Sequence, residues 1–140
     1  MAELHPQLKK DCLVVGRFPL CHLLLMRDAN YPWCILVPDR EGVSEIYELC
    51  EEDQIRLLRE SSYLSRCLAK AFNADKMNIA ALGNVVSQLH VHHVVRHYGD
   101  PAWPAPVWGK VNPKVYSEDA LAETLNRLQA ALTQDFVSEL

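Results

Sequence analysis

The sequence has no excess of positive charge and no long apolar run. Its 140 residues include 14 Lys and Arg against 18 Asp and Glu, which gives a formal net charge of −4. The chain therefore lacks the basic surface typical of proteins that bind nucleic acids. No segment approaches the ~20 apolar residues of a membrane span, and the first ten residues lack the apolar centre of a signal peptide. We expect no nucleic-acid partner, no membrane association and a cytoplasmic location.

The cysteines are too few and too scattered for a disulfide framework. They are odd in number and lie mostly within apolar patterns, at Cys12, Cys21, Cys34, Cys50 and Cys67. No Cys-x-x-Cys pair and no recognisable nucleophile motif is present. We predict reduced, buried thiols that behave as small apolar side chains. A catalytic cysteine beside His90 remains an alternative.

The length and the apolar content fit one domain over residues 1–140, because 49% hydrophobic residues can form a substantial core. Short apolar segments separated by turns predict an antiparallel meander. Farther on, apolar residues recur every three or four positions, which predicts a long helix. Ser117 followed by acidic residues is typical of the start of another helix. We expect an α+β domain with strands at 11–16, 20–27, 33–38, 76–83 and 86–96, and helices at 52–72 and 118–133.

The most informative segment is 87–96, in which histidines occur at a spacing of two. Alternation along a strand would place residues 88, 90 and 92 on one face and 89, 91 and 93 on the other. His90, His92 and the amide of Gln88 would then line one surface, whereas the opposite face is apolar apart from His93. A strand that only packs would more often carry Thr, Tyr or Val at positions 90 and 92. The pattern therefore predicts a chemical site.

Two alternative roles for this histidine pair stay open. Paired histidines on a strand can be solvent-facing or structural. Imidazole is also the commonest metal ligand, but further ligands must come from elsewhere, and His5 and His22 lie far upstream. A metal-dependent enzyme that uses His90, His92 and His93 is disfavoured, because His93 should point away from the other two. We expect no metal site.

The residues Gln88-Leu89-His90-Val91-His92 resemble the motif of the histidine triad (HIT) family, His-φ-His-φ-His-φ-φ, where φ is apolar. The likeness covers about residues 10–110, since several other segments follow in the family's order and spacing: Leu25–Asp28, Ile35–Pro38, the long helix, the strand with Asn78, and Leu82–Val86. Residues 100–109 are similar to the tail of a bacterial branch of about this length. The resemblance implies a HIT-like, antiparallel five-stranded sheet with one long central helix and a C-terminal helix.

Two positions depart from the family motif. Gln88 stands where the first histidine is expected, and His93 occupies the first trailing apolar position. In the family the first member mainly orients its neighbours through hydrogen bonds, so an amide can serve, and the bacterial branch often carries glutamine there. We interpret His93 as a structural residue, because a buried imidazole needs a hydrogen-bond partner.

The resemblance implies a homodimer that hydrolyses or transfers nucleotides at the α-phosphate. His90 would attack the α-phosphorus while the backbone carbonyl of Gln88 holds its other ring nitrogen, and water would hydrolyse the nucleotidyl-histidine. His92 would donate a hydrogen bond to phosphate oxygens or the leaving group. Dinucleoside polyphosphates, such as diadenosine polyphosphates, and nucleoside phosphoramidates are the implied substrates. We expect no required cofactor, although Mg²⁺ could accompany a polyphosphate.

Three further residues align with nucleotide-binding positions of the family. Asp28 would hold ribose hydroxyls, Asn84 would donate to phosphate, and Asn78 would contact phosphate or ribose. Asp28 could instead be a turn residue, and Asn78 a strand-end cap.

Other polar and aromatic residues near the motif allow two roles each. Arg96 and His97 fit either a distal phosphate contact or a solvated strand end. For Trp103 and Trp108 we favour packing over stacking on a base.

A protein of another class also fits the sequence. It would be a nucleotide-binding regulatory protein with little or no catalysis, Gln88 being one step towards loss of activity. Turnover that depends on His90 discriminates between the two functions.

Overall fold

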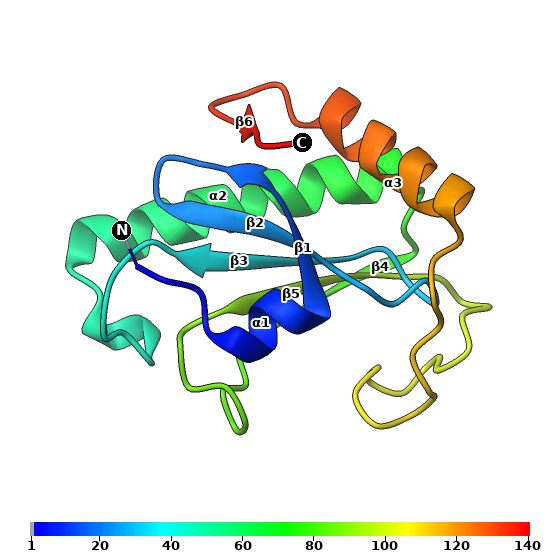
Figure 1. Cartoon of the computed structure of the whole chain (residues 1–140), viewed down its shortest axis with the longest axis horizontal. Helices are drawn as coiled ribbons and strands as arrows, with labels where there is room; N and C mark the ends of the chain where they lie inside the picture. Colours follow the sequence, from blue (N-terminus) through cyan, green and yellow to red (C-terminus); the bar gives the residue numbers. More distant parts are fainter. Residues whose placement is uncertain (1) are drawn as a thin grey trace.

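A six-stranded antiparallel sheet organises the chain (Figure 1). The computed structural model describes residues 2–140. The strand order is β4-β5-β3-β2-β1-β6. The elements follow one another as α1 (Pro6–Asp11), β1 (Cys12–Arg17), β2 (Cys21–Met26), β3 (Trp33–Pro38), the 3₁₀ turn η1 (Ile46–Glu48), α2 (Glu51–Ala71), β4 (Lys76–Ala80), β5 (Val91–Arg96), α3 (Glu118–Ala131) and β6 (Val137–Ser138).

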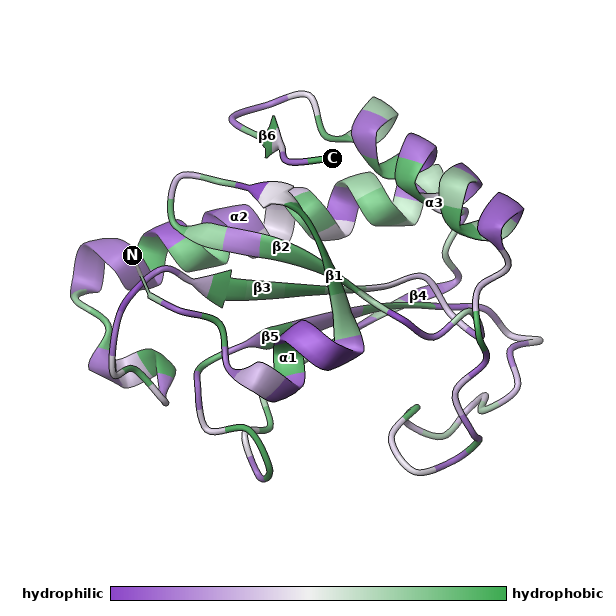
Figure 2. Cartoon of the chain, viewed as in Figure 1, coloured by the Kyte–Doolittle hydropathy of each residue, from purple (hydrophilic) through white to green (hydrophobic). Residues whose placement is uncertain are grey.

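Side-chain alternation along the central strands divides the core into two apolar clusters. On one face Leu23, Leu36 and Val91 pack against Leu64 of α2. On the other face the alternate residues of the same strands pack with the α1 residue Leu8; they include Leu24, Ile35 and Val94. Figure 1 shows α2 and α3 on one side of the sheet and α1 on the other. Both faces of the central strands are therefore covered, which is why β2 and β3 are apolar along almost their whole length (Figure 2).

The two long helices form where local sequence and packing agree. The first turn of α2 is acidic, which suits the positive end of the helix dipole, and Leu57, Leu64 and Leu68 are buried against the sheet. Ser117 caps α3, because its hydroxyl accepts the N–H of Ala120 at 3.1 Å. Among the helices within residues 2–140, none is long and apolar enough to cross a membrane.

The α+β class and both predicted helices are confirmed, but the predicted number of five strands is wrong. The sixth strand, β6, is a two-residue pairing with β1 that has no pattern of its own. It approaches β1 at Gly16, where a Cβ would collide with the carbonyl oxygen of Val137. Sequence patterns also missed α1. Its N-cap is His5, and Pro6 is the first residue of the helix.

The predicted strand at 86–96 is too long, because β5 begins only at Val91. Residues 81–90 form an irregular connection between β4 and β5. The strand predicted at 76–83 likewise ends at Ala80. His90 therefore lies at the point where an irregular segment enters the sheet.

Candidate active site

His90 and His92 lie side by side on the sheet face that α1 covers. Their ring centroids are 4.9 Å apart and their planes are inclined by 68°. Both residues are largely buried. Val91 and Val95 pack on the opposite face, under α2. The predicted division into an imidazole face and an apolar face is confirmed for residues 90–95, but not for Gln88.

A backbone carbonyl fixes the tautomer of His90. Its Nδ1 lies 2.7 Å from the carbonyl oxygen of Gln88. Because a carbonyl oxygen only accepts hydrogen bonds, Nδ1 of the neutral ring must carry the proton. The lone pair of His90 is therefore on Nε2, where it can act as a nucleophile without a separate base.

A tryptophan fixes the opposite tautomer of His92. The indole Nε1 of Trp33 lies 3.0 Å from Nδ1 of His92. An indole N–H only donates, so Nδ1 must be the unprotonated acceptor and Nε2 carries the proton. The two residues are diagonal neighbours on adjacent strands, because Trp33 pairs with Val94 and Ile35 pairs with His92. His92 thus presents a hydrogen-bond donor beside the nucleophilic nitrogen of His90.

Burial also keeps His92 uncharged. Removal from water, together with the nearby His90 and His93, lowers the pKa of His92 to about 4. At neutral pH the ring is therefore a neutral donor that can stabilise charge on a phosphoryl group.

His93 points to the other face of the sheet and serves the fold. Its Nδ1 donates to the carbonyl of Val91 at 3.0 Å, and its Nε2 lies 2.7 Å from the hydroxyl of Ser61 on α2. Both ring nitrogens are satisfied in a fully buried position. The prediction of a structural role is confirmed, and the alternative of one metal held by His90, His92 and His93 is wrong because the rings lie on different faces.

Two tryptophans contact His92 and also line a cavity next to it. Trp33 and Trp108 both meet His92 edge-on, at centroid distances of 5.7 and 5.1 Å. The same two indoles line a cavity of about 870 Å³. Its remaining wall is mixed: Met26, Val107, Val111 and Pro113 are apolar, and the polar part includes Lys10, Asp11, Arg27, Asp28, Lys110 and Asn112. Trp108 packs beside His92, a position that the sequence did not predict, and both roles considered for it, packing and stacking on a base, fit this place.

Asp28 combines a turn role with a position in this cavity. Its Oδ1 accepts the backbone N–H groups of Asn30 at 2.9 Å and Lys114 at 3.2 Å. The structure thus contains the Asx turn that the sequence allowed. Its Oδ2 accepts no hydrogen bond within residues 2–140, so one carboxylate oxygen stays available to a ligand.

The side chain of Gln88 does not orient the histidines, contrary to the expectation. Its amide accepts the N–H of His5 at 2.8 Å and donates to the carbonyl of Glu3 at 3.1 Å. Only its backbone carbonyl contacts His90. The physical reason is that Gln88 precedes β5, so strand alternation does not extend to this residue. The amide instead fastens the segment before α1.

Neither Asn78 nor Asn84 forms a hydrogen bond with His90 or His92 in the described part of the chain. Asn78 lies within β4, not at a strand end, and its side-chain oxygen accepts from Nη1 of Arg96 at 2.8 Å. Asn84 is exposed in the connection between β4 and β5, and it has no hydrogen-bond partner in the described part of the chain.

Arg96 is a buried structural cation, so the alternative of a solvated strand end is wrong. It is 1% exposed and forms two hydrogen bonds with Asp100, at 2.8 and 3.0 Å. Its guanidinium also stacks near the rings of Tyr31 and Trp103. Although burial acts to raise the pKa of Asp100, hydrogen bonds from Arg96 and from backbone N–H groups hold it below its usual value. These hydrogen bonds fasten Asp100, in the loop after β5, to the last residue of that strand.

The thiols do not fit a nucleophile. Cys12, Cys21 and Cys34 are buried as predicted, whereas Cys50 is exposed and Cys67 is half-buried. Burial raises the pKa of Cys12 and Cys34 to about 12, so they stay protonated at neutral pH. None of the cysteines is in a hydrogen bond with His90 within residues 2–140.

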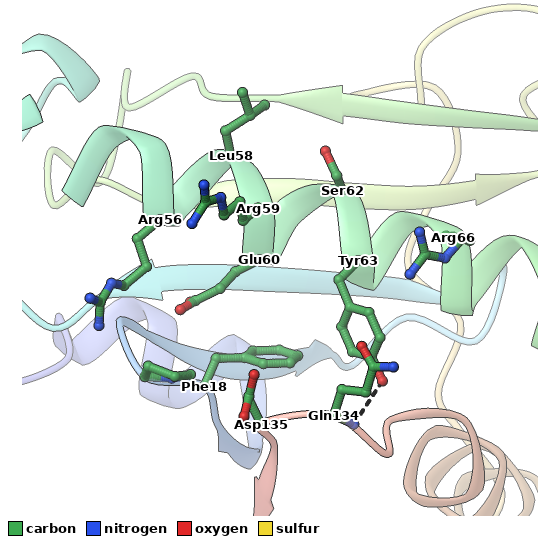
Figure 3. Close-up of a pocket in the computed structure, with 11 residues that line it drawn as sticks. Phe18, Arg56, Leu58, Arg59, Glu60, Ser62, Tyr63, Arg66, Gln134 and Asp135 are labelled. Carbon is green, nitrogen blue, oxygen red and sulfur yellow. Dashed lines mark hydrogen bonds between the residues drawn. The ribbon is translucent and has the colours of Figure 1, made fainter. Parts of the chain in front are cut away.

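A second cavity, of about 630 Å³, lies on the α2 side and lacks histidine (Figure 3). Phe18 and Tyr63 form its apolar part, and Arg56, Arg59 and Arg66 surround it. Its one buried carboxylate, Glu60, already accepts the N–H groups of Leu20 and Cys21 at 2.9 Å. Its other carboxylate, Asp135, is exposed, and no histidine or cysteine lines this cavity within residues 2–140, so we place the candidate catalytic site at the imidazole pair.

Sequence patterns missed the partners that hold the histidines. They place Trp33 only at the start of a strand and Ser61 only within a helix. The signal that could have found Trp33 is its diagonal position to His92, which requires the strand register. No local signal identifies Ser61 as the partner of His93.

Comparison with known proteins places the chain in a family. The HIT domain model matches residues 7–99. A histidine triad protein from Marinobacter aquaeolei VT8 is 52% identical over 96% of this chain and 98% of its own, with a TM-score of 0.93. Corresponding proteins from Bradyrhizobium japonicum and Sinorhizobium meliloti 1021 are 44% and 41% identical, over 94% and 93% of this chain and 98% and 96% of theirs, with TM-scores of 0.92 and 0.90.

No curated protein matches the chain. The family match and the three solved structures nevertheless agree, and the chain belongs to the HIT domain family. This superfamily contains nucleotide-binding proteins and hydrolases. The predicted resemblance to the histidine triad family is confirmed.

Proposed function

We propose that the protein is a nucleotide hydrolase or transferase that cleaves at the α-phosphate of a nucleoside phosphate. The observation that carries this proposal is the pair of adjacent imidazoles in opposite tautomers. One ring offers a lone pair on Nε2 and the other offers an N–H on Nε2, 4.9 Å away between centroids. A phosphoryl transfer needs a nucleophile and a nearby donor for the phosphoryl oxygens.

The reaction has two displacement steps. Nε2 of His90 forms a bond to the α-phosphorus, and the bond from phosphorus to the leaving oxygen or nitrogen breaks. Nδ1 keeps its proton and donates it in a hydrogen bond to the carbonyl of Gln88. This hydrogen bond disperses the positive charge of the nucleotidyl-imidazole. His92 donates a hydrogen bond to a phosphoryl oxygen. Water then attacks the same phosphorus, the P–N bond breaks, and the water proton passes to solvent, which frees the nucleoside monophosphate.

The cavity beside Trp33 and Trp108 is the place we propose for the nucleoside. Its volume of about 870 Å³ and its aromatic and polar lining suit a base and a sugar. Oδ2 of Asp28 would accept the ribose hydroxyls. We assign Asn84 as a phosphate donor, since its connection leads into His90. Asn78 would act mainly by holding Arg96, with its Nδ2 group left for a phosphate contact.

We propose no required cofactor. The nucleophile and the donor are both side chains, so hydrolysis of a phosphoramidate should continue in a metal chelator. Mg²⁺ would enter only as a counterion of a polyphosphate substrate.

We also propose a homodimer, formed through β4 and α2. β4 is an edge strand of the sheet, so one side of its backbone is free to pair with another strand. Nearby apolar side chains are exposed: Leu58 to 67%, Ile79 to 51% and Ile55 to 46%. In Figure 3 Leu58 and Ser62 point to the side of α2 opposite Phe18 and Tyr63. A second copy would pair with β4 and cover this apolar face.

Light scattering on a chromatography column tests the dimer. Leu58→Asp should shift the mass from a dimer to a monomer, because it buries a charge in the interface. Val115→Asp is the matched control, since Val115 is also exposed but lies before α3. A monomeric wild-type protein would refute the dimer.

Turnover assays test the activity. Purified protein is incubated with diadenosine tetraphosphate or adenosine phosphoramidate, and nucleotide release is followed with His90→Ala as the control. We expect release that is lost in the variant. If the wild-type protein binds nucleotide but releases no product, the result would favour the second candidate, a nucleotide-binding regulatory protein. The cavity next to Asp28 is the observation that supports this candidate.

A further inference from the structure

The environment of His92 differs from that of His90 in one respect that affects chemistry. The group that holds Nδ1 of His90 is an acceptor, the carbonyl of Gln88, whereas the group that holds Nδ1 of His92 is a donor, the indole N–H of Trp33. A donor at Nδ1 opposes protonation there, because two N–H groups would then face each other. The Trp33 side chain is itself buried and packed against Tyr31 and Trp108, so it cannot readily turn away.

The other groups around His92 do not offset this effect. Trp108 meets the ring edge-on at 5.1 Å and has no charge. The titratable neighbours are His90 on the same face and His93 on the opposite face, and positive charge on either would disfavour a second cation. Burial acts in the same direction, and together these groups lower the pKa of His92 to about 4. Nothing that faces the ring within residues 2–140 supplies a carboxylate that would favour the imidazolium.

We infer that Trp33 is a positioning residue that keeps His92 as a neutral Nε2–H donor, so that the site favours leaving groups that depart as phosphate anions over those that depart as amines. The preference rests on the proposed function, whereas the tautomer of His92 does not.

The preference follows from the proton balance of the first step. When His90 displaces a phosphate chain from the α-phosphorus, the leaving oxygen already carries a stable negative charge and needs no proton. When it displaces an amine, the leaving nitrogen must gain a proton as the P–N bond breaks. A neutral His92 can give a hydrogen bond but would become an imidazolate if it gave up its proton. The amine must then take its proton from water.

Nitrogen NMR of the wild-type protein tests the tautomer directly. With ¹⁵N-labelled histidine, two-bond proton–nitrogen correlations distinguish a protonated ring nitrogen from an unprotonated one. We expect His92 with the proton on Nε2 and His90 with the proton on Nδ1. A proton on Nδ1 of His92 overturns the inference, whatever the variants do.

Trp33→Phe and Trp108→Phe form a matched pair for the preference. Both remove one indole beside His92, but only Trp33 donates to it. In Trp33→Phe we expect His92 to titrate at higher pH. The ratio of kcat/KM for adenosine phosphoramidate to that for diadenosine tetraphosphate should rise about tenfold near pH 6, the effect of one hydrogen bond. Trp108→Phe should lower both activities together and leave the ratio and the tautomer unchanged.

The outcomes separate the two proposals. An equal change of the ratio in both variants, or no change in Trp33→Phe, overturns the role of Trp33 in substrate preference. If neither substrate is turned over while NMR finds the proton of His92 on Nε2, the proposed function fails and the positioning of His92 by Trp33 stands.

Discussion

His90 and His92 present the same ring nitrogen, Nε2, in opposite protonation states. The difference arises because a backbone carbonyl accepts from Nδ1 of His90, while the indole of Trp33 donates to Nδ1 of His92. Neither arrangement needs a charged group. The fold therefore prepares a nucleophile and a donor before any substrate binds, which is the form of preorganisation that stabilises a phosphoryl transition state most effectively.

Two substitutions at Asp28 separate its turn role from its ligand role. Asp28→Asn keeps a side-chain oxygen for Asn30 and Lys114 but removes the charge, so we expect a KM for nucleotide substrates about tenfold higher, with kcat unchanged, as for one lost hydrogen bond to a charged group. Asp28→Ala should in addition lower the free energy of unfolding by about 1–2 kcal/mol. Steady-state kinetics measure KM and kcat, and urea denaturation measures the free energy of unfolding. An unaltered KM in both variants would remove Asp28 from the nucleotide site.

Arg96→Ala should destabilise the fold strongly. The variant leaves Asp100 buried without its cation and removes the donor to Asn78, which should lower the free energy of unfolding by about 3–5 kcal/mol. Urea denaturation measures the loss. Arg66→Ala is the control, because Arg66 is exposed and should change stability little. A stable Arg96→Ala protein with a raised KM would instead assign Arg96 to phosphate binding.

Substitutions of Gln88 should affect the segment before α1 more than catalysis. In Gln88→Ala the N–H of His5 loses its acceptor, so its hydrogen exchange should become about tenfold faster. Gln88→Glu keeps the acceptor and should retain the protection of this amide. Because only the backbone carbonyl of Gln88 touches His90, kcat should stay within the same order of magnitude in both variants. A large loss of kcat, with His5 exchange unchanged, would restore the orienting role that the sequence suggested.

The buried histidines should make the fold less stable in mild acid. Burial lowers the pKa of both His92 and His93 from 6.5 to about 4. Between these values the unfolded chain binds more protons than the folded chain, so the free energy of unfolding should fall as pH falls from 6.5 to 4. Each group contributes up to about 1.4 kcal/mol per pH unit.

The variant His93→Gln isolates one of these contributions. Denaturation at several pH values should give a shallower decline in this variant than in the wild-type protein. Glu60, whose pKa burial raises, acts in the opposite direction in both proteins and cancels in the comparison. An equally steep decline in the variant would contradict the assignment.

How much the sequence predicts depends on how local the cause is. The helix α2 and the strands β1 to β3 were predictable because their apolar periodicities persist over whole elements. The pairing of β1 with β6 was not predictable, because a two-residue strand is too short to show an alternating apolar pattern. The pairing also depends on the close approach at Gly16. The role of Gln88 was also unpredictable, since it depends on where β5 begins. The histidine pair itself was predictable from the spacing of two, but its tautomers depend on Trp33, which requires the register of β3 and β5.

The most direct test of the proposed mechanism is to search for the covalent intermediate on His90. The protein is mixed with diadenosine tetraphosphate, quenched in alkali, which preserves a P–N bond, and digested for peptide mass spectrometry. We predict an adenylyl group on the peptide that contains His90, located on that residue by fragmentation and absent in His90→Ala. Release of nucleotide without this adduct, or at an equal rate in His90→Ala, would contradict the proposal that His90 is the nucleophile.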